Sequence, residues 1–388
     1  MKKENIKTSG LISIWTLVIV ILIILLVITL RNFLIKSTQF EKTGDIEKQD
    51  SQNLTNQLFY FSTIKDDDEK VLNGAHEFSV NGKYLYVTST KDNGIEIFDI
   101  SNPSEPKEVG KFADTDKTFL KKSHTIVFYK NYAYVSVADD NAIQIFEMKN
   151  PTILVPIKAI LDDEKIGLKG IHGISIKDHY LYSAGMSDNA IDVFDIIDPR
   201  DPRHILTIFD NEKTSLHKPH SFAFLGNYAY VISADEGMEI LDISNPENIK
   251  HIGVIVEDSK TALNGGHDIE IRGKYIYTIG SLDGVAIFDA SNPKSPKQVS
   301  FILPNRTNGL WGGSELDINE DGKYLFTASE IDHAITMIDI KNPLDPTIKS
   351  VIKGADTYNA HYIKVIGNYV YASGLQDYFT IFKFSENE

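Results

Sequence analysis

The segment IFDISNP, residues 97–103, decides the fold because the chain repeats it. Related segments are IFEMKNP (145–151), VFDIIDP (193–199), ILDISNP (240–246), IFDASNP (287–293) and MIDIKNP (337–343). Each joins a run of apolar residues to a proline turn, which is typical of a β-strand and its end. Their prolines are 47 to 50 residues apart: Pro103, Pro151, Pro199, Pro246, Pro293 and Pro343. A period of this length predicts a solenoid or a propeller.

A second repeated feature is a tyrosine-rich strand, which occurs seven times. Two aromatic residues, two positions apart, mark it at 84/86, 132/134, 180/182, 228/230, 275/277, 324/326 and 369/371. In the first unit, residues 76–80, 83–89, 95–100 and 107–113 are four short strand patterns separated by turns. Four antiparallel strands in each of seven units predict an all-β protein, a seven-bladed β-propeller.

The two ends of the repeat array indicate how the ring closes. The seventh unit has no fourth strand pattern, whereas residues 57–63 (QLFYFST) form an isolated strand pattern before the first unit. We therefore expect this N-terminal strand to complete the last blade, because closure leaves no exposed sheet edge. The propeller is predicted to occupy residues 57–388.

An apolar run without any charge, residues 11–30 (LISIWTLVIVILIILLVITL), precedes the repeats. Its length suffices for a helix that spans a membrane, and no small-residue cleavage site follows it. The sequence predicts a cytoplasmic tail at 1–10, a transmembrane helix at 11–30 and a flexible linker at 31–56. Basic residues flank the run almost equally, so the orientation follows only from the short tail. We expect a single-pass protein of the cell membrane with an extracytoplasmic propeller.

The composition excludes several classes of function. The chain has 388 residues, with 39 Lys or Arg against 54 Asp or Glu, so its formal net charge is -15. An acidic chain of this kind is not expected to bind nucleic acid, which requires a basic face. The absence of cysteine excludes disulfides, thiolate metal sites and a cysteine nucleophile.

The repeated motif [IV]-x-[IVL]-[FL]-D-I-S-N-P-x-x-P, best seen at residues 95–106, resembles the LVIVD-repeat family of bacterial and archaeal proteins. The resemblance covers about residues 57–388. It implies that each repeat forms a propeller blade and that the protein is exported or attached to a membrane. It implies no particular activity. The aspartate of the motif, Asp99 in the first unit, is expected to cap the turn that follows it.

One chemical feature repeats with the blades, a histidine at the start of the first strand of each unit. It occurs at His76, His124, His172, His220, His267 and His361, and Ser314 takes its place in the sixth unit. The first strand of a propeller blade lines the central channel, so we expect a ring of histidines near one channel mouth. The turn between the second and third strands, expected on the same face, carries an acid in every unit: Asp92, Asp140, Asp188, Asp235, Asp283, Asp332 and Asp377.

Three roles are open for this ring. Each imidazole N–H could donate to the aspartate of the paired turn, a structural role that every blade would need. Three or four neutral imidazoles could instead bind a divalent transition metal, with the acids behind them. A catalytic role is the third. Trp311, which lies between glycines in the irregular sixth unit, is a further candidate at the channel mouth, or else a packing residue.

We expect a membrane-anchored binding module that presents the channel face to a protein, a glycan or a small ligand, because variable loops of a rigid propeller surround one concavity. One alternative is a metal-dependent lyase or hydrolase at the histidine ring. The other is a structural component of an envelope assembly. No sequence motif names the ligand.

Overall fold

The computed structural model describes residues 57–67, 70–258 and 261–385. These residues belong to the second of two compact units, Leu54–Glu388. The tail, transmembrane helix and linker expected at residues 1–56 lie outside the described residues. In the part of the chain that is described, no helix is long and apolar enough to cross a membrane.

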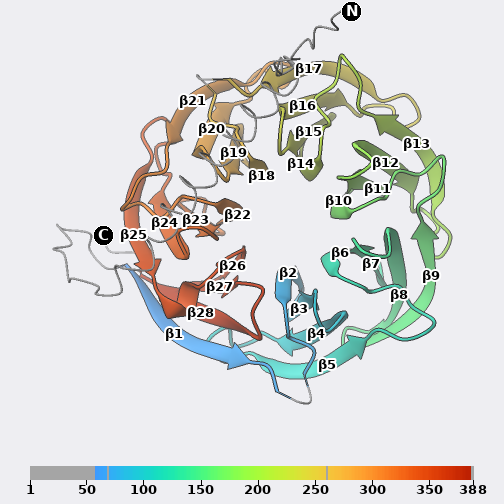
Figure 1. The fold of residues 1–388 in the computed structure, drawn as a ribbon, viewed down its shortest axis with the longest axis horizontal. Coiled ribbons are helices and arrows are strands. Elements are labelled where there is room, and N and C mark those ends of the chain that lie inside the picture. Colours follow the sequence, from blue (N-terminus) through green and yellow to red (C-terminus); the bar gives the residue numbers. More distant parts are fainter. Residues whose placement is uncertain (1–56, 68–69, 259–260, 386–388) are drawn as a thin grey trace, which may run out of the picture. The chain divides into compact units, whose positions relative to one another are not determined.

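The described residues form seven antiparallel sheets of four strands each, and Figure 1 shows these blades around a central axis. Blade 1 comprises β2 (Ala75–Asn81), β3 (Tyr84–Ser89), β4 (Gly94–Asp99) and β5 (Lys107–Ala113). Blade 2 comprises β6 (Ser123–Tyr129), β7 (Tyr132–Val137), β8 (Ala142–Asn150) and β9 (Ile153–Leu161). Blade 3 comprises β10 (Ile171–Lys177), β11 (Tyr180–Gly185), β12 (Ala190–Asp195) and β13 (Arg203–Phe209).

The remaining blades follow in chain order. Blade 4 comprises β14 (Pro219–Leu225), β15 (Tyr228–Ser233), β16 (Gly237–Asp242) and β17 (Lys250–Val256). Blade 5 comprises β18 (Gly266–Arg272), β19 (Tyr275–Gly280), β20 (Gly284–Asp289) and β21 (Lys297–Ile302). Blade 6 comprises β22 (Gly313–Ile318), β23 (Tyr324–Ser329), β24 (Ala334–Asp339) and β25 (Thr347–Lys353). Blade 7 comprises β26 (Tyr362–Ile366), β27 (Tyr369–Ser373), β28 (Tyr378–Phe384) and the N-terminal β1 (Leu58–Lys65).

The closing strand lies where the sequence predicted it. β1 pairs antiparallel with β28 as the outer strand of blade 7, from Leu58 opposite Phe384 to Lys65 opposite Tyr378. Leu58 is buried in the core between the last two blades. The pairing covers the outer edge of β28, so the expectation of a closed ring is confirmed.

The hydrophobic core lies between neighbouring blades. Each of the seven core clusters joins two adjacent blades. Between blades 1 and 2, for example, Tyr86 and Ile95 pack with Ile126 and Val135. The middle strands of the blades are buried along almost their whole length, because a blade needs apolar side chains on both faces to contact both neighbours.

The two repeated sequence features meet at the blade interfaces. The hydroxyl of Tyr86 on β3 donates to the carbonyl oxygen of Pro151 in the next blade, at 2.6 Å. The same bond joins Tyr134 to Pro199 at 2.9 Å, Tyr230 to Pro293 at 2.8 Å, and Tyr371 of blade 7 to Pro103 of blade 1. A buried tyrosine hydroxyl needs such a partner, so the tyrosine and the proline turn form one device that links successive blades.

The aspartate of the proline motif has the capping role expected of it. The Asp99 carboxylate accepts the Ser101 N–H at 2.8 Å, and Asp195, Asp242, Asp289 and Asp339 each accept the N–H two residues further on. These Asx turns fix the chain reversal that leads to the outer strand of each blade.

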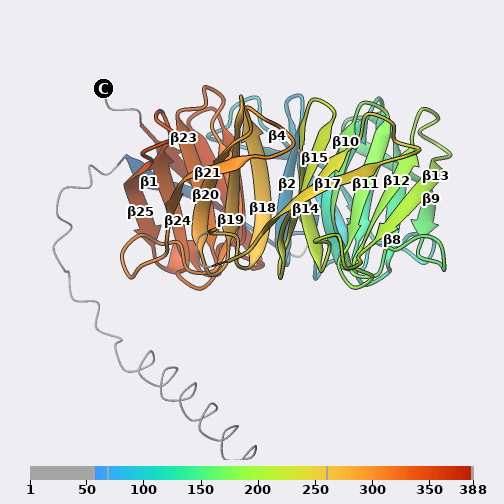
Figure 2. The ribbon, with the colours of Figure 1, turned by 90° about the horizontal axis from the view of Figure 1, so that it is seen from above.

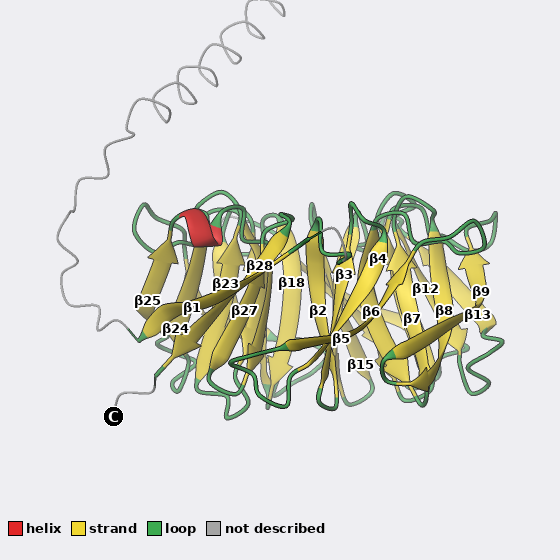
Figure 3. Ribbon diagram, turned by 90° about the horizontal axis from the view of Figure 1, so that it is seen from below, coloured by secondary structure: helices red, strands yellow, loops and turns green. Residues whose placement is uncertain are grey.

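The blade strands run between two faces that carry the loops, as the side views in Figures 2 and 3 show. The single short helix among the described residues, η1 (Ala355–Thr357), lies in the loop that leads to β26. The loops that lead into the inner strands lie on the same face as η1. These inner strands are β2, β6, β10, β14, β18, β22 and β26. The histidines follow directly after these loops.

Candidate functional site

A β-bulge at the start of the inner strands sets the direction of the histidines. In blade 1, the pairing shifts by one residue between Ala75 and Phe78, so that His76 and Glu77 together oppose Thr88. The register shifts at the equivalent place in blades 2 to 6. A bulge bends the strand and changes the direction of its side chains, so the histidine leaves the blade interface and turns to the channel.

Hydroxyl groups on the second strands hold these bulges from the preceding blade. Ser373 donates to the carbonyl oxygen of His76 at 2.7 Å, and Ser136 donates to that of His172 at 2.6 Å. Thr88 makes the same bond to His124 at 2.5 Å. The preceding blade thus fixes the main chain of these three histidines, so blades 7, 1 and 2 position this part of the ring.

The six imidazoles lie against one another in a continuous layer, which we call the histidine layer. Ring centroids of His76 and His124 are 4.1 Å apart, and those of His124 and His172 are 4.4 Å apart. His220 lies 3.7 Å from His172 and 3.8 Å from His267. These distances leave no room for another side chain between consecutive rings.

His361 completes the histidine layer. Its ring centroid is 5.4 Å from that of His267 and 5.3 Å from that of His76. Its Nδ1 is hydrogen-bonded to the Glu330 carboxylate. Ser314, the residue at the histidine position of blade 6, is buried and donates its hydroxyl to the His361 carbonyl oxygen at 2.9 Å. Six rings therefore close the layer, and the small serine occupies the seventh position.

Burial favours the neutral form of five of the six imidazoles. It lowers the pKa of His76, His172 and His220 well below the ordinary value, and neighbouring imidazoles add to the effect. Burial is also the main cause that lowers the pKa of His124 and of His267, in each case to about 3. Neutral imidazole is the form that ligates metals.

Several nitrogens of this layer have no hydrogen-bond partner although they are buried. They are Nδ1 of His76, both ring nitrogens of His124, and Nδ1 of His267. Ring nitrogens of His76, His124 and His172 all lie within 4.8 Å of one another. These three residues are the group in the described chain that could hold a metal ion.

Above the histidine layer, the channel opens into a hollow of about 920 Å³, which we call the mouth cavity. The six histidines form its floor, and loop residues of blades 2 and 3, among them Lys122, Asn141, Lys169 and Met186, form part of its wall. The volume is within the range of small-molecule sites.

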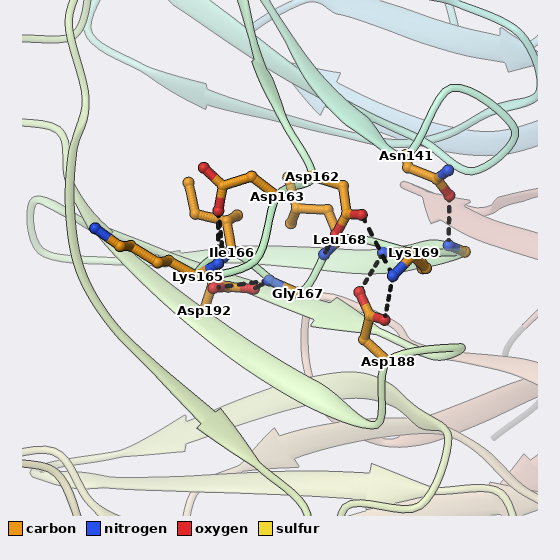
Figure 4. A network of polar contacts seen from close by, with 11 residues as sticks. Asn141, Asp162, Asp163, Lys165, Ile166, Gly167, Leu168, Lys169, Asp188 and Asp192 are labelled. Atoms are coloured by element: carbon orange, nitrogen blue, oxygen red, sulfur yellow. Dashed lines mark hydrogen bonds and ion pairs between the residues drawn. The ribbon is translucent and has the colours of Figure 1, made fainter.

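The turn aspartates hold the loops that lead to the histidines. In Figure 4, the Asp188 carboxylate accepts the backbone N–H of Lys169 at 3.0 Å, three residues before His172. The side chain of Asn141, from the turn of blade 2, accepts the N–H of Gly170 at 2.9 Å. The equivalent aspartates accept N–H groups in the same way: Asp92 from Asn73, Asp140 from Lys121, Asp283 from Asn264 and Asp332 from Trp311.

The pairing of each histidine with its turn aspartate, one of the roles expected from the sequence, needs a correction. Among the described residues, no hydrogen bond joins a turn aspartate to a ring of the histidine layer. Asp235 instead pairs with Lys218 and His217, and Asp377 offers its carbonyl oxygen to the N–H of Asp66. The aspartates bind the loop three residues earlier because the bulge turns the imidazole away from them.

Trp311 lies at the edge of this site. It occupies the same loop position in blade 6 as Lys169 does in blade 3, and its side chain is 39% exposed. It is not one of the described residues that line the mouth cavity. The structure therefore places Trp311 in the loop before β22, where its backbone N–H donates to the Asp332 carboxylate.

A second polar layer lies on the other side of the histidines, farther along the inner strands. Glu77, Asp268 and Glu315 line a small chamber of about 200 Å³ together with Tyr362, and we call it the acid chamber. Burial raises the pKa of Glu77 to about 7, and it raises the pKa of Asp268 and of Glu315 as well. The sequence reasoning missed these carboxylates.

A signal for the acid chamber was present in the sequence. The position directly after the repeated histidine holds a different residue in almost every blade: Glu77, Thr125, Gly173, Ser221, Asp268, Glu315 and Tyr362. Glycine is needed in blade 3, because a Cβ on Gly173 would overlap the carbonyl oxygen of His220. Because this channel-lining position varies between blades, the two sides of the channel differ in chemistry although the blades repeat.

One cation faces the acidic part of the channel. Lys364 on β26 pairs with Asp317 on β22 at 2.9 Å, and Glu270 accepts the backbone N–H of Ile318 at 3.0 Å. Burial and the nearby Asp317 raise the pKa of Glu270 to about 8. The lower half of the channel is thus rich in carboxyl groups, whereas the upper half is made of neutral imidazoles.

Comparisons with known proteins agree with this architecture. The model of the LVIVD repeat matches residues 74–114, 220–253 and 266–301. The chain contains LVIVD repeats. Each match spans one blade, from the start of its inner strand to its outer strand, in blades 1, 4 and 5. The resemblance seen in the sequence is therefore confirmed. No protein of curated function matches the sequence.

Solved structures share the fold of these LVIVD repeats. Virginiamycin B lyase from Staphylococcus aureus is 13% identical, with a TM-score of 0.62 over 84% of this chain and 99% of that chain. A protein from Lactobacillus plantarum is 12% identical, with a TM-score of 0.62 over 76% and 95%. Hydrazine synthase of Kuenenia stuttgartiensis is 15% identical, with a TM-score of 0.60 over 81% and 97%. At these identities the likeness shows the propeller fold alone.

Proposed function

We propose that this LVIVD-repeat propeller is a binding module whose site is the mouth cavity. The observation that carries the proposal is the cavity floor, a layer of buried neutral imidazoles with ring nitrogens that lack partners. Unsatisfied polar atoms at the base of an open concavity favour a ligand that bonds to them. Hydrogen bonds between blades keep the floor rigid, so little order has to be gained on binding.

The shape of the site favours a small ligand over a protein or a glycan. A cavity of about 920 Å³ with its polar atoms at the bottom admits a small molecule or an ion. The rim lysines are engaged, since Lys122 lies 3.9 Å from Asp139 and Lys169 lies 3.3 Å from Asp188. The rim therefore offers little free positive charge for an acidic partner.

Location at the cell membrane is a further part of the proposal. It rests on the uncharged apolar run at residues 11–30 and on the short tail before it. An anchored propeller would meet its ligand outside the cytoplasm, at the membrane surface. Protease treatment of intact cells tests this arrangement, which predicts cleavage of the propeller without lysis of the cells.

A blocked cavity tests the binding site. Met186 lines the cavity wall, so Met186→Trp should fill the entrance, whereas Leu344→Trp places the same side chain at an exposed position outside it. A panel of small metabolites and metal salts is screened for a rise in the melting temperature of the full chain. Compounds that stabilise the wild type and Leu344→Trp but not Met186→Trp support the proposal. If every stabilising compound acts equally on Met186→Trp, the mouth cavity is not the site.

A metal-dependent lyase or hydrolase is the second candidate function. One observation favours it, the cluster of three imidazoles from consecutive blades at the cavity floor. A metal held there would polarise a substrate or activate water in the cavity. Nothing in the described structure favours the third possibility, a structural part of an envelope assembly.

A further inference from the structure

The arrangement of three imidazoles is close to that of a metal site. Ring nitrogens of His76, His124 and His172 lie within 4.8 Å of one another. Two imidazole nitrogens that bind one tetrahedral ion at about 2.0–2.1 Å are roughly 3.4 Å apart. Closing the remaining gap requires a change in the χ angles of these side chains.

These histidines also have the free nitrogens that an ion needs. Nδ1 of His76 and both ring nitrogens of His124 are buried and have no partner among the described residues, and a buried polar atom that stays unsatisfied destabilises the fold. His361 differs, because its Nδ1 is already engaged by Glu330. An ion between His76, His124 and His172 would give an open nitrogen of His76 and one of His124 a partner.

The third histidine has a partner that orients it. The hydroxyl oxygen of Tyr362 lies 3.4 Å from Nε2 of His172. A ring nitrogen held in this way leaves the other nitrogen of the same ring as the metal ligand, which is common around metal-binding histidines. Tyr362 comes from blade 7, so it reaches across the channel to His172 in blade 3.

The chemistry of the donor atoms suits a transition-metal cation. The cluster offers imidazole nitrogens from three histidines, which are metal ligands. Imidazole ligands suit zinc, copper, nickel and cobalt, whereas magnesium and calcium prefer oxygen ligands.

We propose that His76, His124 and His172 bind one divalent transition-metal ion at the floor of the mouth cavity, with a coordination position open to the cavity. This inference rests on the proposed function, because it names the ligand of the same site. An open position is the feature that separates functional from purely structural metal sites. Blades 1, 2 and 3 supply the ligands, so the ion would be off the channel axis.

Metal titration of the full chain tests the inference. Protein freed of metal with EDTA is titrated with Co²⁺, and the visible absorption band of four-coordinate cobalt and equilibrium dialysis are measured. One ion per chain is expected, and Zn²⁺ should displace it. His76→Ala and His124→Ala should each weaken binding at least ~100-fold, since the loss of a direct ligand exceeds the loss of an outer partner.

His267→Ala is the matched control, because His267 is a buried member of the same layer outside the cluster of three. It should bind Co²⁺ within ~5-fold of the wild type, a smaller change than the loss even of an outer partner causes. Equal loss in His267→Ala overturns the assignment of the three ligands. Melting temperatures in EDTA show which variants are folded. If His124→Ala fails to fold, the nitrogen hyperfine pattern of the Cu²⁺-loaded wild type counts the imidazole ligands without any substitution.

The failure of this inference can be separated from the failure of the proposed function. Folded wild-type protein that binds none of these ions overturns the metal site. If Met186→Trp still abolishes stabilisation by an organic compound, the mouth cavity remains a binding site. If neither ions nor compounds bind, both proposals fail.

Discussion

The histidine layer and the acid chamber lie one residue apart on the same strands, yet one is made of imidazoles and the other is rich in carboxyl groups. His76 and Glu77 are consecutive, and the bulge opposite Thr88 directs both away from a regular alternation. The first position is the same in six blades, whereas the second differs from blade to blade. The comparison teaches that a residue repeated in every blade serves a need that all blades share. A position that varies between blades gives one part of the channel its own chemistry.

Burial acts on the two layers in opposite directions. It lowers the pKa of the imidazoles and raises the pKa of the carboxyl groups, and both shifts favour the uncharged form. The channel is therefore a stack of two titratable layers that share one tendency toward neutrality. Changes that charge one layer, or remove the cation that faces it, test how far the layers are independent.

The largest effect is expected from the cation of the acidic half. Lys364→Met leaves the Asp317 carboxylate without its cation, although it still accepts the Val365 N–H, and Asp317 is 9% exposed whereas Lys364 is 35% exposed. The free energy of unfolding at pH 7 should fall by about 3 kcal/mol in urea titrations. The double variant Lys364→Met with Asp317→Asn should recover part of this loss. A change below ~0.5 kcal/mol, the range of an exposed ion pair, would show that the pair is screened by solvent.

The next effect is a pH dependence in the same half. The folded pKa of Glu270 is about 8 against an ordinary 4.5, so its contribution to stability is full below pH 4.5 and is lost as the pH rises through 8. The slope of this pH dependence between the two pKa values is about 1.4 kcal/mol per pH unit, and Glu270→Gln removes it. Between pH 5 and pH 7 the variant should gain roughly 2 kcal/mol relative to the wild type in urea unfolding.

The histidine layer should show a pH dependence of stability with the opposite sign, and it therefore serves as a control. The folded pKa of His267 is about 3 against 6.5, so its contribution is present above pH 6.5 and is lost as the pH falls toward 3. His267→Ala should therefore reduce the loss of stability on the acid side and leave the slope between pH 7 and pH 8 unchanged. If it alters the alkaline slope instead, the two layers titrate as one system.

A smaller effect is expected from completing the ring. Ser314→His places a seventh imidazole where the ring centroids of His267 and His361 are only 5.4 Å apart. Overpacking should lower the free energy of unfolding by about 1–3 kcal/mol in urea titrations. Ser314→Ala loses only the hydrogen bond to the His361 carbonyl, which costs about 1 kcal/mol. If Ser314→His is as stable as the wild type, the layer has room for seven rings.

The smallest effect concerns the residue that joins the two layers. Tyr362→Phe keeps the ring that lies 4.1 Å from His76 and removes the hydroxyl that lies 3.4 Å from His172. The contact is long, so the variant should lose about 0.5–1 kcal/mol of stability in urea titrations. A loss above ~2 kcal/mol would mean that the Tyr362 hydroxyl makes hydrogen bonds to other groups besides His172.

The histidine layer was largely predictable from the sequence, whereas its partners were not. A constant spacing places equivalent residues at equivalent positions of a repeat, so six imidazoles were expected at one channel mouth. The bonds of the turn aspartates were not predictable, because the bulge redirects the imidazole by an angle that spacing does not reveal. The acid chamber was missed because Glu77, Asp268 and Glu315 share a repeat position but not a residue type with the other blades, so no repeated acid marks that position.

The sequence by itself determined the number of blades, the four strands of each blade and the strand that closes the ring, because these follow from local strand and turn signals repeated along the chain. It also determined which residue types repeat in the channel. Only the tertiary structure decided which side chains meet. Contacts such as Tyr362 with His172, or Tyr371 with Pro103, join blades far apart in the sequence, and they exist only once the ring has closed.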